Sequence, residues 1–144
     1  GRHRPFLHEE LVHVPLIVRL PAAAEAGRRV PALTQPADVA ATLAGWFDAP
    51  FPADGVDLRP LLRGDGEAVR DAAVSGLELD GVSEWAIRTP AWAYLLPGPQ
   101  KPDDDPREPL LFEKPDDRWE VNDLRSRHPD VADELDAKLR TLLV

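Results

Sequence analysis

Hydrophobic and polar residues along the chain follow two different repeats, and each repeat predicts a different kind of element. Between residues 36 and 50 the apolar positions recur at the spacing of one helical face. Pro36 suits the first turn of a helix, and Asp38 favours the positive end of the helix dipole. We therefore expect a helix that begins near Pro36, ends at residues 48–50, and presents one apolar face: Val39, Leu43, Trp46 and Phe47.

The end of the chain predicts a second helix. Pro129 opens it, acidic residues dominate its first half, and basic residues lie near its end, an order that complements the helix dipole. An apolar stripe at helical spacing runs along it: Val131, Leu135, Leu139 and Leu142. A further single helical turn with an apolar underside is expected within residues 55–64.

Between these helices the repeat changes towards two residues, which is typical of strands. The sequence Asp80-Gly81 is a common hairpin turn between two of them. We expect four short strands, at residues 72–79, 83–89, 91–96 and 110–113. The fold class is therefore α+β, with a small antiparallel sheet of about four strands that the C-terminal helix covers.

The most apolar stretch of the sequence lies at residues 11–19. It is short, rich in β-branched residues and bounded by Pro21, so we predict a buried strand there. Pro15 lacks a backbone donor, which places this strand at an edge or places Pro15 where pairing begins. Together with the helix from Pro36, the strand would complete a larger α/β sheet.

Composition and charge exclude several classes of protein. The 144 residues are 43% hydrophobic and 30% charged, as in a folded chain, and the 16 prolines exclude a long helical bundle. A net charge of −9 argues against partners such as nucleic acid and anionic membranes, which bind basic surfaces. No apolar run approaches the ~20 residues that span a bilayer. The sequence contains no methionine, even at position 1, and we expect it to be a piece of a longer protein.

The sequence offers several reactive side chains but no complete active site. It has no cysteine, and none of its serines stands in a Gly-x-Ser-x-Gly turn. His8 and His13 are five residues apart, whereas a zinc-protease helix needs a spacing of four. Residues 103–105 are acidic but lack the spaced ligands and glycine turn of a calcium loop. Ser126 and His128 are interpreted as the approach to the last helix.

Five phrases of the sequence stand in an order found in one protein family. Residues 7–19 contain EELVHVPLIVR, similar to "EE…RVPLI", and residues 32–43 are similar to a "DLAPTLL" helix. Residues 55–62 are similar to "G.SL.PLL", residues 86–94 to "VRT..YKYI" and residues 111–124 to "LYDL..DP.E..NL". Each phrase alone is weakly specific. In this order and spacing they resemble the C-terminal part of the sulfatase family, within the alkaline phosphatase superfamily, over nearly the whole chain.

The resemblance implies a parent enzyme that hydrolyses sulfate esters. In that family a Cys or Ser in Cys/Ser-x-Pro-x-Arg becomes formylglycine, whose hydrate attacks sulfur, and a divalent metal, usually calcium, polarises the sulfate oxygens. This sequence contains neither that motif nor Asp-His-Gly, so formylglycine and calcium are expected upstream, and the segment alone is expected to be inactive. The expected partners are the missing N-terminal catalytic domain and a sulfated small molecule or glycan, the substrate of the parent.

The resemblance also implies a place for substrate contacts. The family often has a Gly-Lys pair shortly before the "VPLI" phrase, and that lysine touches the sulfate. Gly1-Arg2 stands near this position, Arg4 is the second candidate, and His3 has a weaker match. Arg2, His3 and Arg4 are therefore expected to bind substrate, although an arginine replaces the point charge of lysine by a planar fork. No residue of this chain is expected to be catalytic or to bind a metal.

The resemblance divides the chain into the end of an α/β catalytic domain, residues 1–64, and an α+β subdomain, residues 65–144. Two alternatives remain open. The parent could be a related phosphodiesterase or phosphonate hydrolase, because the residues that distinguish these enzymes surround the absent nucleophile. The chain could also be a non-catalytic interaction module. No feature of the sequence fixes the compartment.

Overall fold

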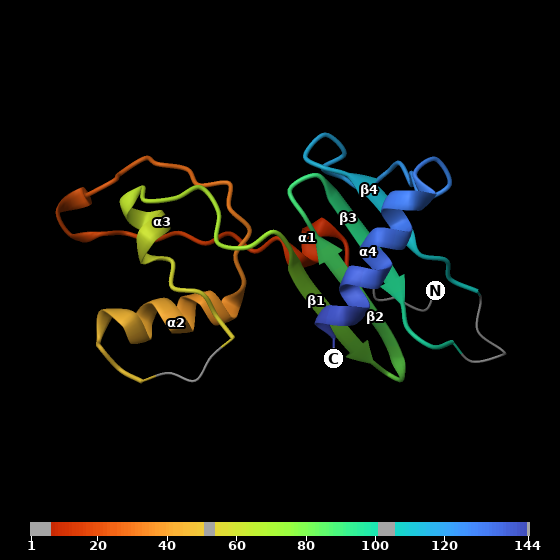
Figure 1. The fold of residues 1–144 in the computed structure, drawn as a ribbon, viewed down its shortest axis with the longest axis horizontal. Helices are drawn as coiled ribbons and strands as arrows, with labels where there is room; N and C mark the ends of the chain where they lie inside the picture. The colour runs from red at the N-terminus through yellow and green to blue at the C-terminus, as the bar shows by residue number, and fades with distance from the viewer. Residues whose placement is uncertain (1–6, 51–53, 101–105, 144) are drawn as a thin grey trace. The chain divides into compact units, whose positions relative to one another are not determined.

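The computed structural model describes residues 7–50, 54–100 and 106–143. They form two compact units (Figure 1). The sheet unit consists of Gly1–Pro15 and Val74–Val144, and the helical unit consists of Leu16–Ala73. The sequence-based division at residue 64 concerns the domains of a longer parent and stays a prediction.

The sheet unit is built on four antiparallel strands in the order β1-β2-β3-β4. In the register, Ile87 of β2 lies opposite Tyr94 of β3, which lies opposite Leu111 of β4. The strand bounds agree closely with the predicted ones: β1 Ala73–Leu79, β2 Val82–Arg88, β3 Trp92–Pro97 and β4 Leu110–Glu113. The predicted α+β class, with a small antiparallel sheet and a C-terminal helix, is confirmed.

The turn between β1 and β2 forms at the predicted hairpin sequence. Asp80 and Gly81 both have positive φ, 53° and 75°. Two consecutive positive φ angles are what a tight hairpin turn of the right twist requires, and aspartate and glycine tolerate them best.

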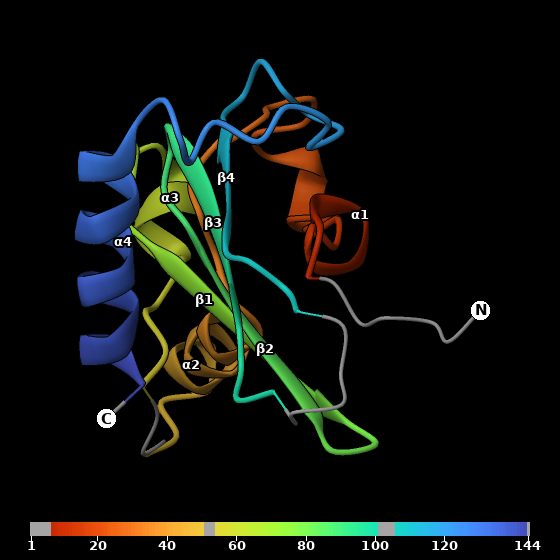
Figure 2. The ribbon, with the colours of Figure 1, turned by 90° about the vertical axis from the view of Figure 1, so that its right-hand side faces the viewer.

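Helix α4 (Pro129–Leu142) covers one face of the sheet by packing on β2 and β3 (Figure 2). Leu135 and Leu139 of the predicted stripe are buried, together with Ala132, which the prediction did not include. Leu142, the last residue of the stripe, is 54% exposed. The hydroxyl of Tyr94 on β3 donates a hydrogen bond to Asp136 of α4 at 3.2 Å. No helix in the described ranges is both long and apolar enough to cross a bilayer.

The opposite face of the sheet carries a short helix, α1 (Glu9–Val12) (Figure 2). Leu7 packs there with buried residues from three strands: Ala86, Ala93, Leu95 and Phe112. Val12 of α1 and Leu77 of β1 pack against this cluster. The sheet is therefore covered on both faces, and the N-terminal segment belongs to its core.

The predicted strand at residues 11–19 is wrong for this structure. Residues 9–12 are helical, and residues 13–20 form neither a helix nor a strand. Ile17, in the middle of the stretch, is 90% exposed. Two physical reasons explain the error. The first turn of α1 is capped by the side chain of Glu120, which lies far away in the sequence. The apolar residues after Pro15 belong to the helical unit and not to the sheet unit.

The helical unit is organised around a buried carboxylate. Helix α2 (Pro36–Trp46) begins after Gln35, as predicted, and the side chain of Asp38 is fully buried. That carboxylate accepts hydrogen bonds from the backbone N–H groups of Gln35 at 2.7 Å and Val56 at 2.8 Å, and it pairs with Arg70. A buried charge needs such partners, so this cluster ties α2 to two later segments of the unit.

The apolar face predicted on α2 exists, but it is not the buried face. Asp38 and Thr42 are the buried residues of α2. The four residues of the predicted stripe are exposed, up to 80% for the last of them: Val39, Leu43, Trp46 and Phe47. The Asp38 cluster fixes the polar side of the helix inwards, which leaves the apolar side outwards.

The remaining elements of the helical unit are short. The segment Pro21–Ala23 forms a 3-10 turn, η1, and Arg59–Arg63 forms the single helical turn α3. The predicted apolar underside of α3 is confirmed, because Leu58 and Leu61 are buried. The turn ends at Gly64, whose φ of 87° lies in the left-handed region that glycine adopts at helix ends.

Thr42 gives a test of this packing. Its hydroxyl donates to the Asp38 carbonyl at 2.6 Å and accepts from the Leu58 N–H at 2.8 Å. Thr42→Val keeps the shape but leaves the Leu58 N–H buried without an acceptor, so we expect it to lower the free energy of unfolding by about 1–3 kcal/mol. Urea unfolding followed by circular dichroism measures this. The control is Thr141→Val, which removes an exposed hydroxyl that donates to the Ala137 carbonyl at 2.9 Å. Equal effects of both changes would contradict the role of Thr42.

Candidate functional site

Arg2, His3 and Arg4 lie outside the described residues. The first described residue, Leu7, follows Arg4 by three positions, and its backbone N–H donates a hydrogen bond to the buried carboxylate of Glu84 on β2. The chain that leads away from the candidate substrate-binding residues is therefore fixed to the sheet from Leu7 onwards.

Glu84 is one of several buried carboxylates that hold this region together. Its side chain is almost fully buried, and burial raises the pKa of this carboxyl above its ordinary value, against the hydrogen bond from Leu7 and the charge of Arg107. The guanidinium of Arg107 lies 3.1 Å from Glu84, and it also donates to the Ser83 carbonyl at 3.1 Å. This contact ties the segment before β4 to β2, next to Leu7.

A second buried cluster joins α1 to the turn that follows β4. The ammonium group of Lys114 is 0% exposed and lies 2.5 Å from Glu9 and 3.0 Å from Glu120. It also donates to the Asp117 carbonyl at 3.0 Å. Glu9 and Lys114 are 105 residues apart in the sequence. We call Glu9, Lys114 and Glu120 the Lys114 cluster. It connects α1 to the turn after β4 by charge-assisted hydrogen bonds, which are stronger than hydrogen bonds between neutral groups.

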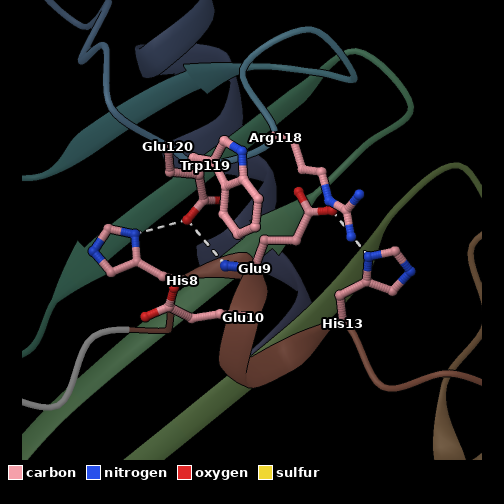
Figure 3. A pocket seen from close by; sticks show the side chains of 7 residues that line it. All are labelled: His8, Glu9, Glu10, His13, Arg118, Trp119 and Glu120. Atoms are coloured by element: carbon pink, nitrogen blue, oxygen red, sulfur yellow. Dashed lines mark hydrogen bonds and ion pairs between the residues drawn. The ribbon is translucent and has the colours of Figure 1, made fainter.

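Glu120 also caps α1 from outside the helix. Its Oε2 accepts a hydrogen bond from the backbone N–H of Glu9 at 3.0 Å and lies 2.7 Å from Nδ1 of His8. A carboxylate at a helix N-terminus satisfies a free N–H group and interacts favourably with the helix dipole. One side chain therefore fixes where α1 begins and how His8 is oriented (Figure 3).

The Lys114 cluster forms part of the wall of a pocket of about 190 Å³. The ring of Trp119 lies above the first turn of α1, between His8 on one side and His13 on the other (Figure 3). The pocket is lined by α1 and its flanks and by the turn after β4: His8, Glu9, Glu10, His13, Arg118, Trp119 and Glu120. It combines an aromatic ring with carboxylates, imidazoles and a guanidinium.

Four of these lining residues are exposed: Glu10, His13, Arg118 and Trp119. Trp119 is 71% exposed, and the guanidinium carbon of Arg118 lies 5.3 Å from the centre of its ring. His13 is 68% exposed, with Nδ1 at 2.9 Å from Glu9. Within the described chain, Arg118 has no carboxylate within ion-pair distance. The exposed part of the pocket therefore offers an aromatic ring, a cation and the carboxylate of Glu10.

The ion contacts of Glu9 give the stability of the fold a pH dependence. Burial alone would raise the pKa of this carboxyl, but the hydrogen bonds and charges of Lys114 and His13 outweigh it and hold the pKa below its ordinary value of 4.5. The ionised form therefore stabilises the fold above the unfolded-state pKa, and this contribution is lost as the pH falls through the lower folded-state pKa.

We expect Glu9→Gln to reduce the free energy of unfolding more at pH 7 than at pH 3. At pH 3 the Glu9 carboxyl of the unsubstituted chain is itself largely protonated in the unfolded state. The substitution therefore removes less stability at pH 3 than at pH 7. Urea unfolding at both pH values measures the difference. Glu134→Gln, which removes an exposed carboxylate from α4, controls for the change of net charge. The same loss of stability at both pH values would contradict the account.

The two histidines singled out by their spacing have separate partners. His8 bonds to Glu120, and its ring packs against Phe112 with ring centres 5.9 Å apart. His13 bonds to Glu9. Among the residues that the structure describes, no group of three or more His, Asp and Glu is arranged to hold a metal ion. His128 directly precedes α4, as predicted, and packs on Trp92, while residues 103–105 lie outside the described chain.

Sequence reasoning missed most of this site. Glu120 lies inside the family-like phrase of residues 111–124, so that phrase could have indicated it. Lys114 carries no spacing signal, because its partner Glu9 lies 105 residues earlier, and Trp119 lines the pocket with residues of α1 that are equally distant in the sequence. Only a tertiary contact brings the two segments together.

Comparison with known proteins yields one informative finding. No family model matches the chain, and no curated protein matches it. Several solved structures share its fold. One of them is a sulfatase from a core genetic locus that orchestrates metabolism of multiple glycosaminoglycans by Bacteroides thetaiotaomicron. It is 25% identical to this chain, with a TM-score of 0.55.

That match covers 73% of this chain but 24% of the sulfatase chain. This chain therefore spans about a quarter of the length of the protein that it resembles. The similarity supports a sulfatase-like fragment. It agrees with the resemblance of the five sequence phrases, which is independent of the coordinates.

Proposed function

We propose that this chain is the C-terminal part of a sulfatase-type hydrolase, whose sulfate-ester chemistry is performed by residues outside this sequence. The observation that carries the proposal is the structural match at 25% identity to a quarter of a sulfatase chain. The order of the five family-like phrases supports it. The substrate of such a parent would be a sulfated small molecule or glycan.

The exposed apolar residues of the helical unit support a missing covering domain. Single exposed apolar residues are common, but a helical stripe of them marks a contact surface. The helical unit exposes six such side chains on α2 and after Pro15: Leu16, Ile17, Val18, Leu43, Trp46 and Phe47. Because the chain covers 24% of the sulfatase that it resembles, we propose that the catalytic part of the same parent covers these residues.

Within this proposal the sheet unit positions the N-terminal segment. Leu7 is held by Glu84, and α1 is held by the Lys114 cluster. We propose that these contacts direct Arg2, with Arg4 and His3 as weaker candidates, towards the sulfate group in the parent. Fixed cations of this kind stabilise the negative charge that develops in the transition state.

The groups that the family would supply have no place among the described residues. The chain has no cysteine and no Ser-x-Pro-x-Arg, so it cannot form the formylglycine of that motif. Glu9 and Glu120 pair with Lys114, His13 and His8, and the described residues contain no group of three or more His, Asp and Glu arranged to hold a metal ion. Calcium and formylglycine are therefore expected in the part of the parent that lies outside this sequence.

The coding sequence upstream of Gly1 tests the proposal. We expect it to encode Cys/Ser-x-Pro-x-Arg and, within a few tens of codons of Gly1, Asp-His/Asn-Gly. An upstream stop codon, or a long upstream region without the first motif, would contradict the proposal and leave the interaction module as the remaining alternative.

In the parent enzyme we expect Arg2→Ala to lower kcat/KM for a sulfate ester by about tenfold or more, and Arg4→Ala to lower it less. A tenfold loss corresponds to about 1.4 kcal/mol of transition-state stabilisation, a modest value for one fixed cation. Steady-state assays with an aryl sulfate measure both variants. A larger loss for Arg4→Ala would contradict the assignment of Arg2.

A further inference from the structure

We propose that the pocket beside α1 binds one pyranose unit of a glycan, with the sugar ring on Trp119 and an acidic substituent of the sugar on Arg118. This inference rests on the proposed function for the statement that the glycan is the substrate of the parent. The binding itself rests on the pocket.

The exposure of Trp119 is the first observation. A tryptophan is large and apolar, and burying it contributes strongly to stability, so a side chain that stays 71% exposed in a concave site is available for a ligand. The ring lies over the first turn of α1, among the other side chains that line the pocket (Figure 3). Aromatic faces pack well against the C–H face of a pyranose, which is apolar while the rim of the sugar is polar.

The size of the pocket is the second observation. Its volume of about 190 Å³ lies below the ~300–1,000 Å³ of sites that enclose a drug-sized ligand. Such a pocket suits one ring and leaves the rest of a longer ligand outside. A monosaccharide unit within an oligosaccharide meets this requirement, because its neighbours extend into solvent.

The polar groups around the ring are the third observation. Arg118 has no carboxylate at ion-pair distance within the described chain, and a guanidinium binds carboxylate or sulfate oxygens in pairs. The exposed carboxylate of Glu10 accepts hydrogen bonds from hydroxyl groups, and the exposed imidazole of His13 also lines the pocket. These groups match a sugar with hydroxyls on its rim and one acidic substituent.

The Lys114 cluster gives the site a fixed wall. Glu9 and Glu120 are already occupied by Lys114, His8 and His13, so they need not rearrange when a ligand enters. Lys114 offsets one of these two negative charges, which reduces the repulsion that an anionic sugar would meet in an otherwise acidic chain. A preorganised wall lowers the entropic cost of binding.

Nuclear magnetic resonance on the 144-residue chain tests the proposal through the indole N–H signal of Trp119. The probes are an unsaturated chondroitin disaccharide, which carries a carboxylate, the neutral disaccharide diacetylchitobiose, inorganic sulfate and tetramethylammonium. We expect the chondroitin disaccharide to shift this signal with a millimolar Kd and the neutral sugar to bind several-fold more weakly. Sulfate and tetramethylammonium should leave the signal unchanged.

Matched variants separate the pocket from general effects. Trp119→Ala and Arg118→Ala should each raise the Kd of the chondroitin disaccharide by about tenfold or more, read from the remaining pocket signals. Trp46→Ala removes an exposed tryptophan of the helical unit. Arg127→Ala removes an exposed arginine of the sheet unit, to which Arg118 also belongs. Both controls should leave the Kd within about twofold. Circular dichroism of each variant checks that the fold is retained.

Several results would overturn the proposal. Sulfate that binds as tightly as the disaccharide would show a simple anion site, and a response to tetramethylammonium alone would show a cation site. Equal losses for Trp119→Ala and Trp46→Ala would place the sugar elsewhere. If the 144-residue chain binds the disaccharide but the complete enzyme has no sulfatase activity, the proposed function is wrong and the sugar site stands. If the complete enzyme is active but the 144-residue chain binds no sugar, the sugar site is wrong and the proposed function stands.

Discussion

Lys114→Met is expected to lower the free energy of unfolding by about 3–5 kcal/mol, because it leaves the buried carboxylate of Glu120 and the partly buried carboxylate of Glu9 without their shared cation. The ammonium group is fully buried between Glu9 and Glu120, and it donates to the Asp117 carbonyl as well. Methionine keeps most of the side-chain volume, so the loss is electrostatic and not a loss of packing. Equilibrium unfolding in urea at pH 7 measures it.

The matched control is Arg125→Met, which breaks the ion pair of Arg125 with Glu108 at 2.9 Å. Both partners of that pair are solvent-exposed, so the expected cost is below about 1 kcal/mol. A cost for Lys114→Met that is no larger than that of Arg125→Met would show that the cluster does not hold α1 to the turn after β4.

Leu139→Ala is expected to cost about 2–5 kcal/mol, because Leu139 is fully buried between α4 and the sheet. Its removal leaves a cavity against β2 and β3, on which α4 packs. Thermal or urea unfolding measures the change.

Leu142→Ala provides the control on the same helix. Leu142 belongs to the stripe predicted from the sequence, but it is 54% exposed, so its truncation should change the stability by about 0.5 kcal/mol or less. Glu134→Ala, at an exposed position of α4, should also have a small effect. Equal losses for Leu139→Ala and Leu142→Ala would show that the stripe packs differently from the structure described.

The sheet and α4 could be predicted from the sequence because their signals are local. Alternation with a period of two fixes which residues of β2 and β3 face each side, and Asp80-Gly81 forces the turn between β1 and β2. The spacing of Leu135 and Leu139 fixes the buried side of α4. Each of these elements carries its own pattern, and neighbouring strands follow one another in the chain.

Residues 11–19 and α2 show where local patterns fail. An apolar run indicates burial, but it does not say which surface buries it, and Ile17 finds no such surface within the described chain. On α2 the buried carboxylate of Asp38 decides which side faces inwards, against the apolar stripe. In both cases tertiary contacts of charged side chains, and not the local apolar pattern, decide which residues are buried.

The candidate site was invisible in the sequence for a different reason. The pocket joins α1 to the turn around Trp119, and Lys114 and Glu120 reach α1 across more than a hundred residues. No periodicity records such a contact. The spacing of His8 and His13 excludes a zinc-protease helix. Their carboxylate partners, Glu120 and Glu9, are identified only from the fold.

The measurement that tests the account most directly is the hydrolysis of an aryl sulfate by the product of the complete gene. The account predicts turnover by the complete product, loss of that turnover when the Cys or Ser of its Cys/Ser-x-Pro-x-Arg motif is replaced by alanine, and no turnover by the 144-residue chain alone. A complete product that hydrolyses phosphodiesters but not sulfate esters, or turnover by the 144-residue chain itself, would contradict it.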